Sequence, residues 1–600
     1  VTSRPAAAGA DWLRREEFTA LHLDRMTPPD LAAFVRQWHQ AVRELGEELP
    51  CTVEELPQYE QSLLNSLKDR PHLQSLAGTP LLASMLCAMH LNRGSQLPRD
   101  RMELYRNALH TLVHERDAHR NVPSAVDSRL SLGDKLVLLR DLAWRLSDNN
   151  RSEISLEQAE RYVGRKLTGM RHLEERDGVR VLDQLRGRSG VLRSPAVGRL
   201  DFVHRTFQEY LAAQEATEED RIGNLVGRAH LDIWRETIIM AAGHANRPQR
   251  EELLGGILDR AEEEPRHARR LRLLAAACQE TVLEFSEGLA GRLDSAVGAL
   301  LPARRETDPP SLAAVGTSLL RRLPRSLGEL TEKAAVQTVR TAALIGGAEA
   351  LDLLAGYTDD RREPVLAELV GAWAYFDADA YADQVLAALP LRRQRVTLSH
   401  PGQLQAATRL RDISEVDIQY ALREFAALAD LPPLIRLNVS QRPESVDLAV
   451  LEAAHPELRL LGLGGRGPVK HLGALGDLRE LRILVFGLRG VPDLEDLCLG
   501  PRFHYLSLVH ADMVSLAPLA RCPSITQLDL WTAQAVLPKG MDAVSGLPLL
   551  KRLTLHGVDV ASWLATSQVP PTVEHLALSN CLLPDDPRAL EFPGVDVQVH

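Results

Sequence analysis

A leucine repeat of nearly constant period occupies the C-terminal part of this 600-residue chain. Six short segments share the pattern apolar-x-x-Leu-x-apolar, in which the second apolar residue is a leucine. These central leucines are Leu461, Leu484, Leu506, Leu528, Leu553 and Leu576. The steps between these leucines are 23, 22, 22, 25 and 23 residues, and Leu437 lies a further 24 residues upstream. Val595, Val597 and Val599 extend the series at its end. Because each segment buries its leucines only against neighbouring turns, a constant period keeps them in one column.

This period lies within the range of about 20–29 residues that is typical of leucine-rich repeats, whose core is L-x-x-L-x-L-x-x-N/C-x-L. We therefore predict a leucine-rich-repeat array over residues 396–600. The Asn/Cys position is filled as expected only by Cys581, and the other repeats have Arg466, Arg489, Ala511, Ala533 and Val558 there. The hydrogen-bonding ladder along this turn is therefore expected to be mostly absent, and the array to be short and gently curved.

The chain before the array is expected to be helical. Thr27 and Pro28 form a typical helix start, a capping hydroxyl followed by a proline at the first helical position. Further amphipathic helices are predicted at about 57–68, 72–92 and 99–117. Residues 219–395 show helical spacing almost throughout, which predicts an α-solenoid connector of HEAT-like helical pairs. The expected fold class is mainly α with a C-terminal α/β leucine-rich-repeat solenoid.

A smaller unit precedes the connector. Helices are predicted at about 131–147, 156–167 and 178–187, the second opened by the capping-box pattern of Ser155 and Gln158. A hairpin over 190–193 and 199–203 follows, and three helices before a hairpin is the order of a winged helix. Winged helices often bind DNA, so a transcription regulator is one alternative. The net charge of −11 and the absence of a Lys/Arg-dense third helix argue against nucleic acid as a partner.

Composition and cysteine spacing exclude several other classes. No stretch reaches the roughly 18 apolar residues of a membrane-spanning helix, and no secretory signal is visible at the start. The cysteines have neither metal-ligand nor disulfide-framework spacing and are Cys51, Cys87, Cys278, Cys498, Cys522 and Cys581. We expect buried free thiols in a cytoplasmic protein that does not bind membranes.

Neither a metal site nor a phosphate loop is predicted. His114 and His119 flank a glutamate but are five residues apart, so they do not share a helix face as the ligands of a zinc-protease box do. No G-x-x-x-x-G-K-[ST] motif occurs. The G-x-G-x-x-G match at 462–467 lies inside the repeat column, where the next strand arrives on the repeat period, so a dinucleotide site is not expected there.

Two motifs stand apart from the repeats. The first is the segment FVHRTFQEYLAA at 202–213, in which His204 lies where the hairpin ends and a helix begins. A lone histidine there is often structural, yet an imidazole beside exposed helical N–H groups is also well placed to meet an anion. The second is VTSRP at 1–5, whose Arg4 at a strand end suits a phosphate.

These segments resemble NACHT-type STAND NTPases, a family that includes animal NOD-like receptors and many bacterial defence proteins. FVHRTFQEYLAA resembles the family's winged-helix signature, and VTSRP its sensor-1 strand. The segment LAGTPLL at 76–82 is similar to the helical-domain segment with its adenine-side proline. Leu97-Pro98-x-x-Arg101-x-x-Leu104-Tyr105 also fits the family pattern, although Thr79 stands where the family often has Asn.

The resemblance implies roles for three residues. Arg4 would sense the terminal phosphate of bound ATP, Pro80 would pack near the adenine, and His204 would contact the β-phosphate of ADP and latch the closed state. The phosphate loop and the acidic residues that bind Mg²⁺ are absent from this chain. ATP or ADP with Mg²⁺ is therefore expected in a full-length parent only, itself expected to be a slow ATPase. Because the chain starts with Val1, it reads as a fragment or as a reading frame with a misassigned start.

The resemblance also implies a domain order. The expected parts are the end of a NACHT core (1–26), a helical domain (27–125), a winged helix (126–218), the connector (219–395) and the repeats (396–600). Such a protein would sense a protein ligand at its repeats and form a homo-oligomer under ADP/ATP control, in bacteria commonly for antiphage defence. The main alternative is a scaffold whose helical and leucine-rich repeats bind proteins without any nucleotide.

Overall fold

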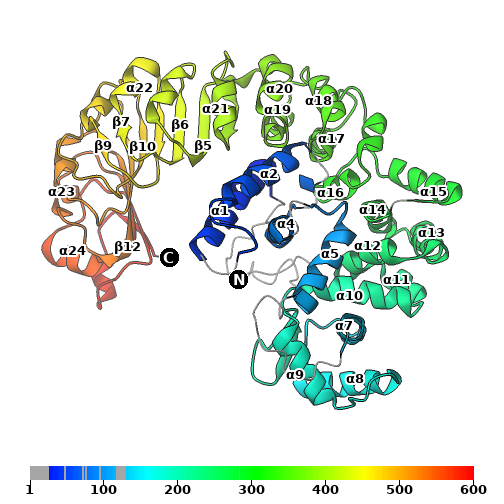
Figure 1. Ribbon diagram of the computed structural model, residues 1–600. Coiled ribbons are helices and arrows are strands. Elements are labelled where there is room, and N and C mark those ends of the chain that lie inside the picture. The colour runs from blue at the N-terminus through cyan, green and yellow to red at the C-terminus, as the bar shows by residue number, and fades with distance from the viewer. Residues whose placement is uncertain are drawn as a thin grey trace. The chain divides into compact units, whose positions relative to one another are not determined.

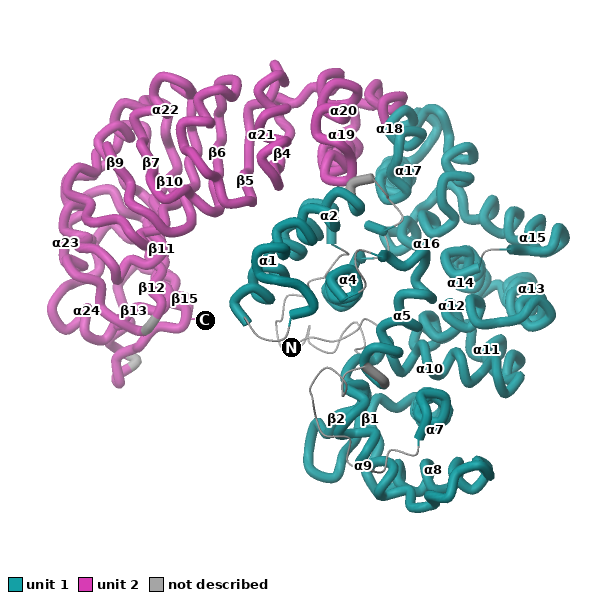
Figure 2. Tube along the Cα trace, in the orientation of Figure 1, with its two compact units in different colours: residues 1–353 teal, residues 354–600 magenta. Residues whose placement is uncertain are grey.

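The computed structural model describes residues 26–45, 49–69, 73–74, 77–92, 96–115, 130–282 and 284–599. The chain divides into two compact units, Val1–Leu353 and Leu354–His600 (Figure 2). About half of the described chain is helical, and a parallel sheet of ten strands lies in the second unit. This confirms, at a coarse level, the predicted combination of helices and a C-terminal sheet. The division into five parts is finer and stays a prediction.

The first unit begins with a group of helices. They are α1 (Pro28–Leu45), α2 (Leu56–Asp69), α4 (Pro80–Asn92), α5 (Arg101–His110) and the π-helical turn η2 (Thr111–Glu115). The predicted start of α1 is confirmed, because the Thr27 hydroxyl donates to Asp30 over 2.6 Å and accepts from the Asp30 N–H over 3.4 Å. The single helix predicted over 72–92 is wrong, since α4 begins at Pro80. Proline has no N–H to donate and disfavours a helical conformation at Thr79, so it suits only a helix start.

A winged helix follows in the first unit (Figure 1). Its elements are α7 (Leu132–Asp148), β1 (Glu153–Ser155), α8 (Leu156–Gly169), α9 (Gly178–Arg188), β2 (Leu192–Arg193), β3 (Arg199–Phe202) and α10 (Arg205–Glu218). The three strands form an antiparallel sheet in the order β1-β3-β2. The helices lie within two residues of their predicted bounds. Of the predicted capping box, the Ser155 hydroxyl accepts from the Gln158 N–H over 3.3 Å. The return bond to the Ser155 N–H is absent from the described contacts, and the Gln158 side-chain oxygen accepts instead from the Ser155 hydroxyl over 3.4 Å.

Helices continue through the rest of the first unit and into the second. They are α11 (Ile222–Arg228), α12 (Arg235–His244), α13 (Arg247–Glu263), α14 (Ala268–Cys278), α15 (Glu287–Gly298), α16 (Pro309–Ala313), α17 (Glu332–Ile345), α18 (Ala348–Ala355), α19 (Glu363–Gly371) and α20 (Ala378–Gln384). Successive helices pack together, with α14 in contact with α12, α13, α15 and α16. One apolar core of mainly Leu, Ala and Val runs from Leu31 to Ala296. Aromatic residues make up only 4% of the chain, and the core is accordingly built mainly from small and branched side chains.

The parallel sheet carries the leucine column of the second unit. Its strands are β4 (Arg395–Leu398), β5 (Glu415–Ala421), β6 (Arg436–Gln441), β8 (Leu460–Leu463), β10 (Ile483–Gly487), β11 (Tyr505–Val509), β12 (Gln527–Val536), β13 (Arg552–Val558), β14 (His575–Ser579) and β15 (Asp596–Val599), which lie side by side in chain order. Leu461 pairs with Leu437 on one side and Leu484 on the other, and every central leucine of the series stands opposite the next. Val396 and Val416 extend the same column upstream.

The glycine motif at 462–467 is part of this stack. Gly462 and Leu463 end β8, and the short strand β9 (Val469–Lys470) follows the glycines, so the helix that a dinucleotide fingerprint requires is missing. A Cβ at Gly464 would lie 2.5 Å from the Ser440 carbonyl oxygen in the preceding repeat. Glycine is therefore needed for close stacking of neighbouring turns.

The expectation of buried free thiols is met only in part. All six cysteines are free, and Cys87, Cys278 and Cys522 are buried, but Cys498 is exposed. Cys581, at the Asn/Cys position, donates from its Sγ to the Leu555 carbonyl of the preceding repeat over 3.3 Å, as a ladder residue does. In the described ranges, no group of three or more His, Cys, Asp or Glu side chains is placed to hold a metal ion. Among these same residues, no helix has both the length and the apolarity to cross a membrane.

Candidate functional site

Of the three predicted nucleotide-binding residues, the structure describes Pro80 and His204 but not Arg4. Arg4 lies outside the described residues, as do the whole 1–5 motif and His119. Pro80 is the exposed first residue of α4, and His204 is exposed directly before α10. Within the described chain, no hydrogen bond, ion pair or ring contact links Pro80 with His204. The role assigned to each of them stays a prediction.

The segment around Pro80 is fixed by backbone contacts. The buried Gly78 accepts a hydrogen bond at its carbonyl from the Met26 N–H over 2.9 Å. The Thr79 hydroxyl accepts from the Leu82 N–H over 3.4 Å and so caps the first turn of α4. The start of α4 is thereby tied to the residue where the described chain begins.

His204 is held at the junction of the winged hairpin and α10. The Val203 N–H donates to the Val191 carbonyl over 2.8 Å, which continues the hairpin to this point. His204 is extended, with φ −133° and ψ 132°, and its carbonyl accepts from the Phe207 N–H over 3.1 Å. Its side chain caps no N–H of the helix, and the first turn of α10 contains no acidic residue. An exposed imidazole beside these N–H groups is available to an anion.

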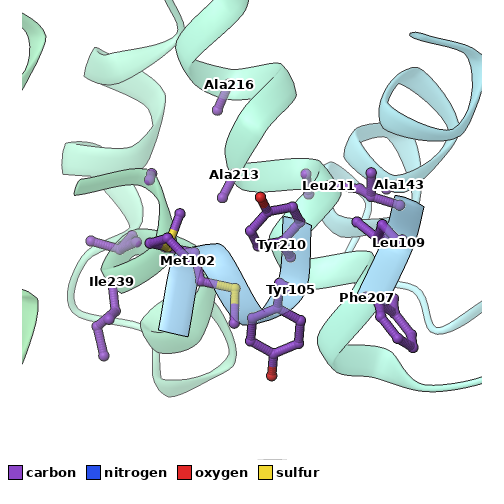
Figure 3. Close-up of a cluster of buried hydrophobic side chains, with 14 of the residues drawn as sticks. Met102, Tyr105, Leu109, Ala143, Phe207, Tyr210, Leu211, Ala213, Ala216 and Ile239 are labelled. Atoms are coloured by element: carbon purple, nitrogen blue, oxygen red, sulfur yellow. The ribbon is translucent and has the colours of Figure 1, made fainter. Parts of the chain in front are cut away.

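Two motifs separated by about a hundred residues pack against each other (Figure 3). Tyr105 of α5 stacks on Tyr210 of α10 with ring centroids 5.3 Å apart and planes at 28°. The edge of Phe207 meets Tyr105 at 6.1 Å, and Tyr210 lies 4.6 Å from His244 of α12. Tyr105, Phe207 and Tyr210 are all buried. The cluster of Tyr105, Phe207, Tyr210 and His244, called here the aromatic junction, joins α5, α10 and α12.

A buried arginine anchors α5 to the helices that follow the winged helix. Arg101 is 7% exposed, and its Nη2 donates to the Glu236 carboxylate of α12 over 2.7 Å. A second carboxylate, Glu280, lies 4.0 Å away, and the guanidinium sits 5.8 Å from the Tyr105 ring centroid. Burial opposes the charge of Arg101, but Glu236 and Glu280 raise its pKa above the ordinary value. Arg101 therefore stays charged inside the core.

Burial changes proton binding at the aromatic junction. Burial, reinforced by the nearby charges of Arg106 and Arg140, lowers the pKa of His244 to about 3. Burial also raises the pKa of Tyr210 to about 12, against the opposing effect of Arg106. Both groups are thus neutral at pH 7. The aromatic junction acts as an uncharged packing contact beside the Arg101–Glu236 ion pair.

A second charge network joins α10 to the winged-helix core. Lys166 of α8 donates to the buried Glu215 of α10 over 2.9 Å, and Arg140 of α7 lies 3.8 Å from the same carboxylate. Gln208 of α10 donates from its Nε2 to the Ser147 hydroxyl and to the Arg151 carbonyl, each over 3.1 Å. α10 is therefore bound to α7 and α8 on one side and to α5 and α12 on another.

One side of these contacts carries a sequence signal, and the other does not. Arg101 and Tyr105 belong to the segment at 97–105 that resembles the NACHT family pattern. Phe207 and Tyr210 belong to the segment at 202–213 that resembles its winged-helix signature. Glu236 and His244 lie far along the chain in an ordinary helical pattern. No local signal marks them, since only the three-dimensional packing of α12 brings them to α5 and α10.

The third helix of the winged helix offers little free positive charge. Arg180 of α9 pairs with Glu175 over 3.3 Å, and Arg186 pairs with Asp183 over 2.9 Å. DNA phosphates are contacted by Lys and Arg side chains, which are less available when a carboxylate neighbours them. These ion pairs count against α9 as a recognition helix.

Comparison with known proteins identifies the class of the domain built around α10. Residues 101–216 match the family model of a winged helix-turn-helix domain C-terminal to NACHT. The match begins at Arg101 and ends in α10. It therefore contains Tyr105, Phe207 and Tyr210 of the aromatic junction but not His244. It supports a NACHT-associated protein. No curated protein matches the chain.

Solved structures similar to the chain include two internalins from Listeria monocytogenes. One, inlF, is 14% identical, with a TM-score of 0.23, over 34% of this chain and 57% of the internalin. The other, inlC2, is 19% identical, with a TM-score of 0.21, over 33% of this chain and 83% of the internalin. The assignment of repeats rests on the sheet register and the leucine period instead of this likeness.

Proposed function

We propose that the chain is the sensor and regulatory part of a NACHT-type signalling ATPase. The observation that carries this proposal is the winged-helix match at 101–216. The packing of its two motifs supports the proposal, because α5, α10 and α12 meet at the aromatic junction and the Arg101–Glu236 ion pair. A rigid junction of this kind is suited to pass a shift of α10 to the helices on either side.

The nucleotide-facing part of this function is assigned to His204. Its exposed imidazole at the start of α10, with no bond to the helix, fits contact with a phosphate oxygen. In the parent protein, ADP held by a phosphate loop and Mg²⁺ would provide that phosphate. Arg4 and Pro80 are proposed to contact the terminal phosphate and the adenine.

The input is assigned to the repeats. One face of the sheet presents side chains suited to a protein surface: Trp531 is 39% exposed and lies 4.4 Å from the His556 ring, and the Tyr505 hydroxyl donates to Asp529 over 2.5 Å. Exposed aromatic side chains are enriched at protein interfaces. A protein ligand that binds the open state better than the closed one would favour nucleotide exchange and self-assembly. Antiphage defence is the proposed setting of this cytoplasmic switch.

The test is nucleotide retention in the full-length parent protein. We expect His204→Ala to lower the fraction of protein purified with bound ADP and to raise basal self-assembly, because a latch on the closed state is lost. The matched control is His267→Ala. His267 also precedes a helix, α14, without a side-chain bond to it.

The outcomes separate the three functions considered. Unchanged ADP occupancy in His204→Ala contradicts the latch. A parent protein that contains no nucleotide, and whose assembly does not respond to ADP or ATP, would instead support the nucleotide-independent scaffold. Salt-sensitive DNA binding by the winged helix would be required for a transcription regulator.

A further inference from the structure

Three consecutive repeats place an arginine at the same position. Arg442, Arg466 and Arg489 each follow the central leucine of their repeat by five residues, after Leu437, Leu461 and Leu484. The strands of these repeats, β6, β8 and β10, are neighbours in parallel register. Neighbouring strands lie about 4.8 Å apart, so the arginines stand in a row just beyond the C-terminal ends of these strands. We call this row the arginine column.

Arg442 forms the buried base of the column. It is 5% exposed, and its guanidinium lies 5.4 Å from the Phe486 ring centroid. Its Nη2 donates to the Arg489 carbonyl over 2.7 Å and thus reaches across the repeat between them. Nε and Nη1 are buried without a partner among the described residues. Burial lowers the pKa of Arg442 to about 10. An incompletely paired buried cation is costly and favours a nearby anion.

The outer part of the column is also unpaired. Arg466 is exposed and Arg489 is half-buried, and neither side chain has an ion pair or hydrogen bond within the described chain. His510 lies next to them: burial and the charges of Arg489 and Arg466 lower its pKa, whereas Asp512 opposes them. The three arginines of the column bring positive charge to this place, and Asp512 is a carboxylate near His510.

Backbone donors accompany these side chains. Gly465 and Gly490 have positive φ values of 88° and 79°, and each adjoins an arginine of the column. The N–H groups of Gly465, Arg466, Arg489 and Gly490 donate to no described acceptor. Successive N–H groups around a residue of positive φ form concavities that bind anions.

We propose that the arginine column binds an oxyanion, a phosphate or carboxylate group of a ligand. The planar guanidinium groups of Arg466 and Arg489 would hold its oxygens in charge-assisted hydrogen bonds. Arg442 adds positive charge from beneath, and the glycine turns add N–H donors. The site requires only the repeat array, so it goes beyond the proposed signalling role and does not depend on it.

The test is isothermal titration of the whole chain with two probes at constant ionic strength. Pyrophosphate represents the phosphate source and a glutamate-rich peptide the carboxylate source. We expect saturable binding of at least one probe, weakened about 10- to 100-fold in the double variant Arg466→Ala/Arg489→Ala. Both side chains are surface-accessible, and circular dichroism checks that the variant is folded.

The matched control is Arg482→Ala. Arg482 is exposed in the same repeat as Arg489, but it precedes the N-terminal end of β10, whereas Arg489 follows the C-terminal end. Binding by this control should equal that of the unaltered chain. Pyrophosphate binding alone assigns a phosphate ligand, and peptide binding alone a carboxylate ligand. Absence of saturable binding of both probes, or equal losses in Arg482→Ala and in the double variant, would overturn the site.

Discussion

Buried polar side chains in this chain differ in how well they are satisfied. Arg101 has carboxylate partners inside the core, and Arg442 has a single carbonyl. His90 of α4 is 0% exposed, and neither ring nitrogen has a hydrogen-bond partner in the described structure. The neighbouring His39 is bonded through Nδ1 to the Val35 carbonyl over 2.8 Å. These differences predict different responses to substitution and to pH.

His90 should make the first unit sensitive to acid. Burial, and to a smaller extent His39, lowers the pKa of His90 from 6.5 to about 4. Between these values the unfolded chain binds a proton that the folded chain does not, so stability is lost as the pH falls from about 6.5 towards 4. The loss is at most about 1.4 kcal/mol per pH unit.

The variant that tests this is His90→Leu. It should be neutral or stabilising at pH 7, because it removes two unpaired buried nitrogens, and its stability should fall less between pH 6.5 and 5. Urea unfolding at several pH values measures the difference, with His504→Leu, at a partly exposed site, as the control. Parallel pH profiles for His90→Leu and the unaltered chain would contradict the assignment.

The Arg101–Glu236 ion pair should be important for stability. Glu236→Ala leaves a buried guanidinium with only the more distant Glu280, and we expect a loss of about 3 kcal/mol in the free energy of unfolding, the lower end of the range for breaking a buried ion pair. The exposed pair Arg161–Glu157 serves as the control, and Glu157→Ala should cost at most about 0.5 kcal/mol. Denaturant titration compares the two, and equal effects would be inconsistent with a structural role for Arg101.

At the scale of elements, periodicity was a better guide than local helix signals. The repeat period predicted the strand register, because a strand in a stack has only one alignment that keeps its leucines buried. The helix predicted over 72–92 is too long at its N-terminal end, because apolar spacing continues through Pro80, the residue at which α4 begins. The leucine pattern does not predict the two upstream strands β4 and β5, because valine replaces the central leucine at Val396 and Val416.

The close stacking of β6 and β8 depends on a glycine. A Cβ at Gly464 would lie 2.5 Å from the Ser440 carbonyl oxygen, so Gly464→Ala must push the two turns apart. We expect a cost of about 1–3 kcal/mol, in the range of overpacking substitutions. At Gly473 a Cβ would meet only the Asp496 carbonyl at 3.5 Å, an ordinary contact, so Gly473→Ala is the control. Denaturation that shifts equally in both variants would rule out this constraint.

At the scale of the whole molecule, the sequence indicated which folds are present more clearly than where the chain divides. The boundary between compact units falls at Leu353–Leu354, inside a long helical stretch in which composition does not change. The roles of Pro80 and His204 stay predictions: that of Pro80 comes from a family motif alone, and that of His204 also from its place at the start of a helix. Glu236 contacts Arg101 and His244 contacts Tyr210 only because α12 packs beside them, which no short-range pattern encodes.

Two compact units, each with a core of its own, predict that core substitutions act locally. Leu211 of α10 and Leu528 of β12 are both fully buried, one in each unit. Replacing either with alanine removes the same buried atoms and should cost about 2–5 kcal/mol. We therefore expect calorimetry to resolve two transitions, with Leu211→Ala lowering the midpoint of one and Leu528→Ala lowering that of the other. If each variant lowers both midpoints equally, the units unfold as a single cooperative body, and a ligand at the repeats would then act on the stability of the winged helix directly.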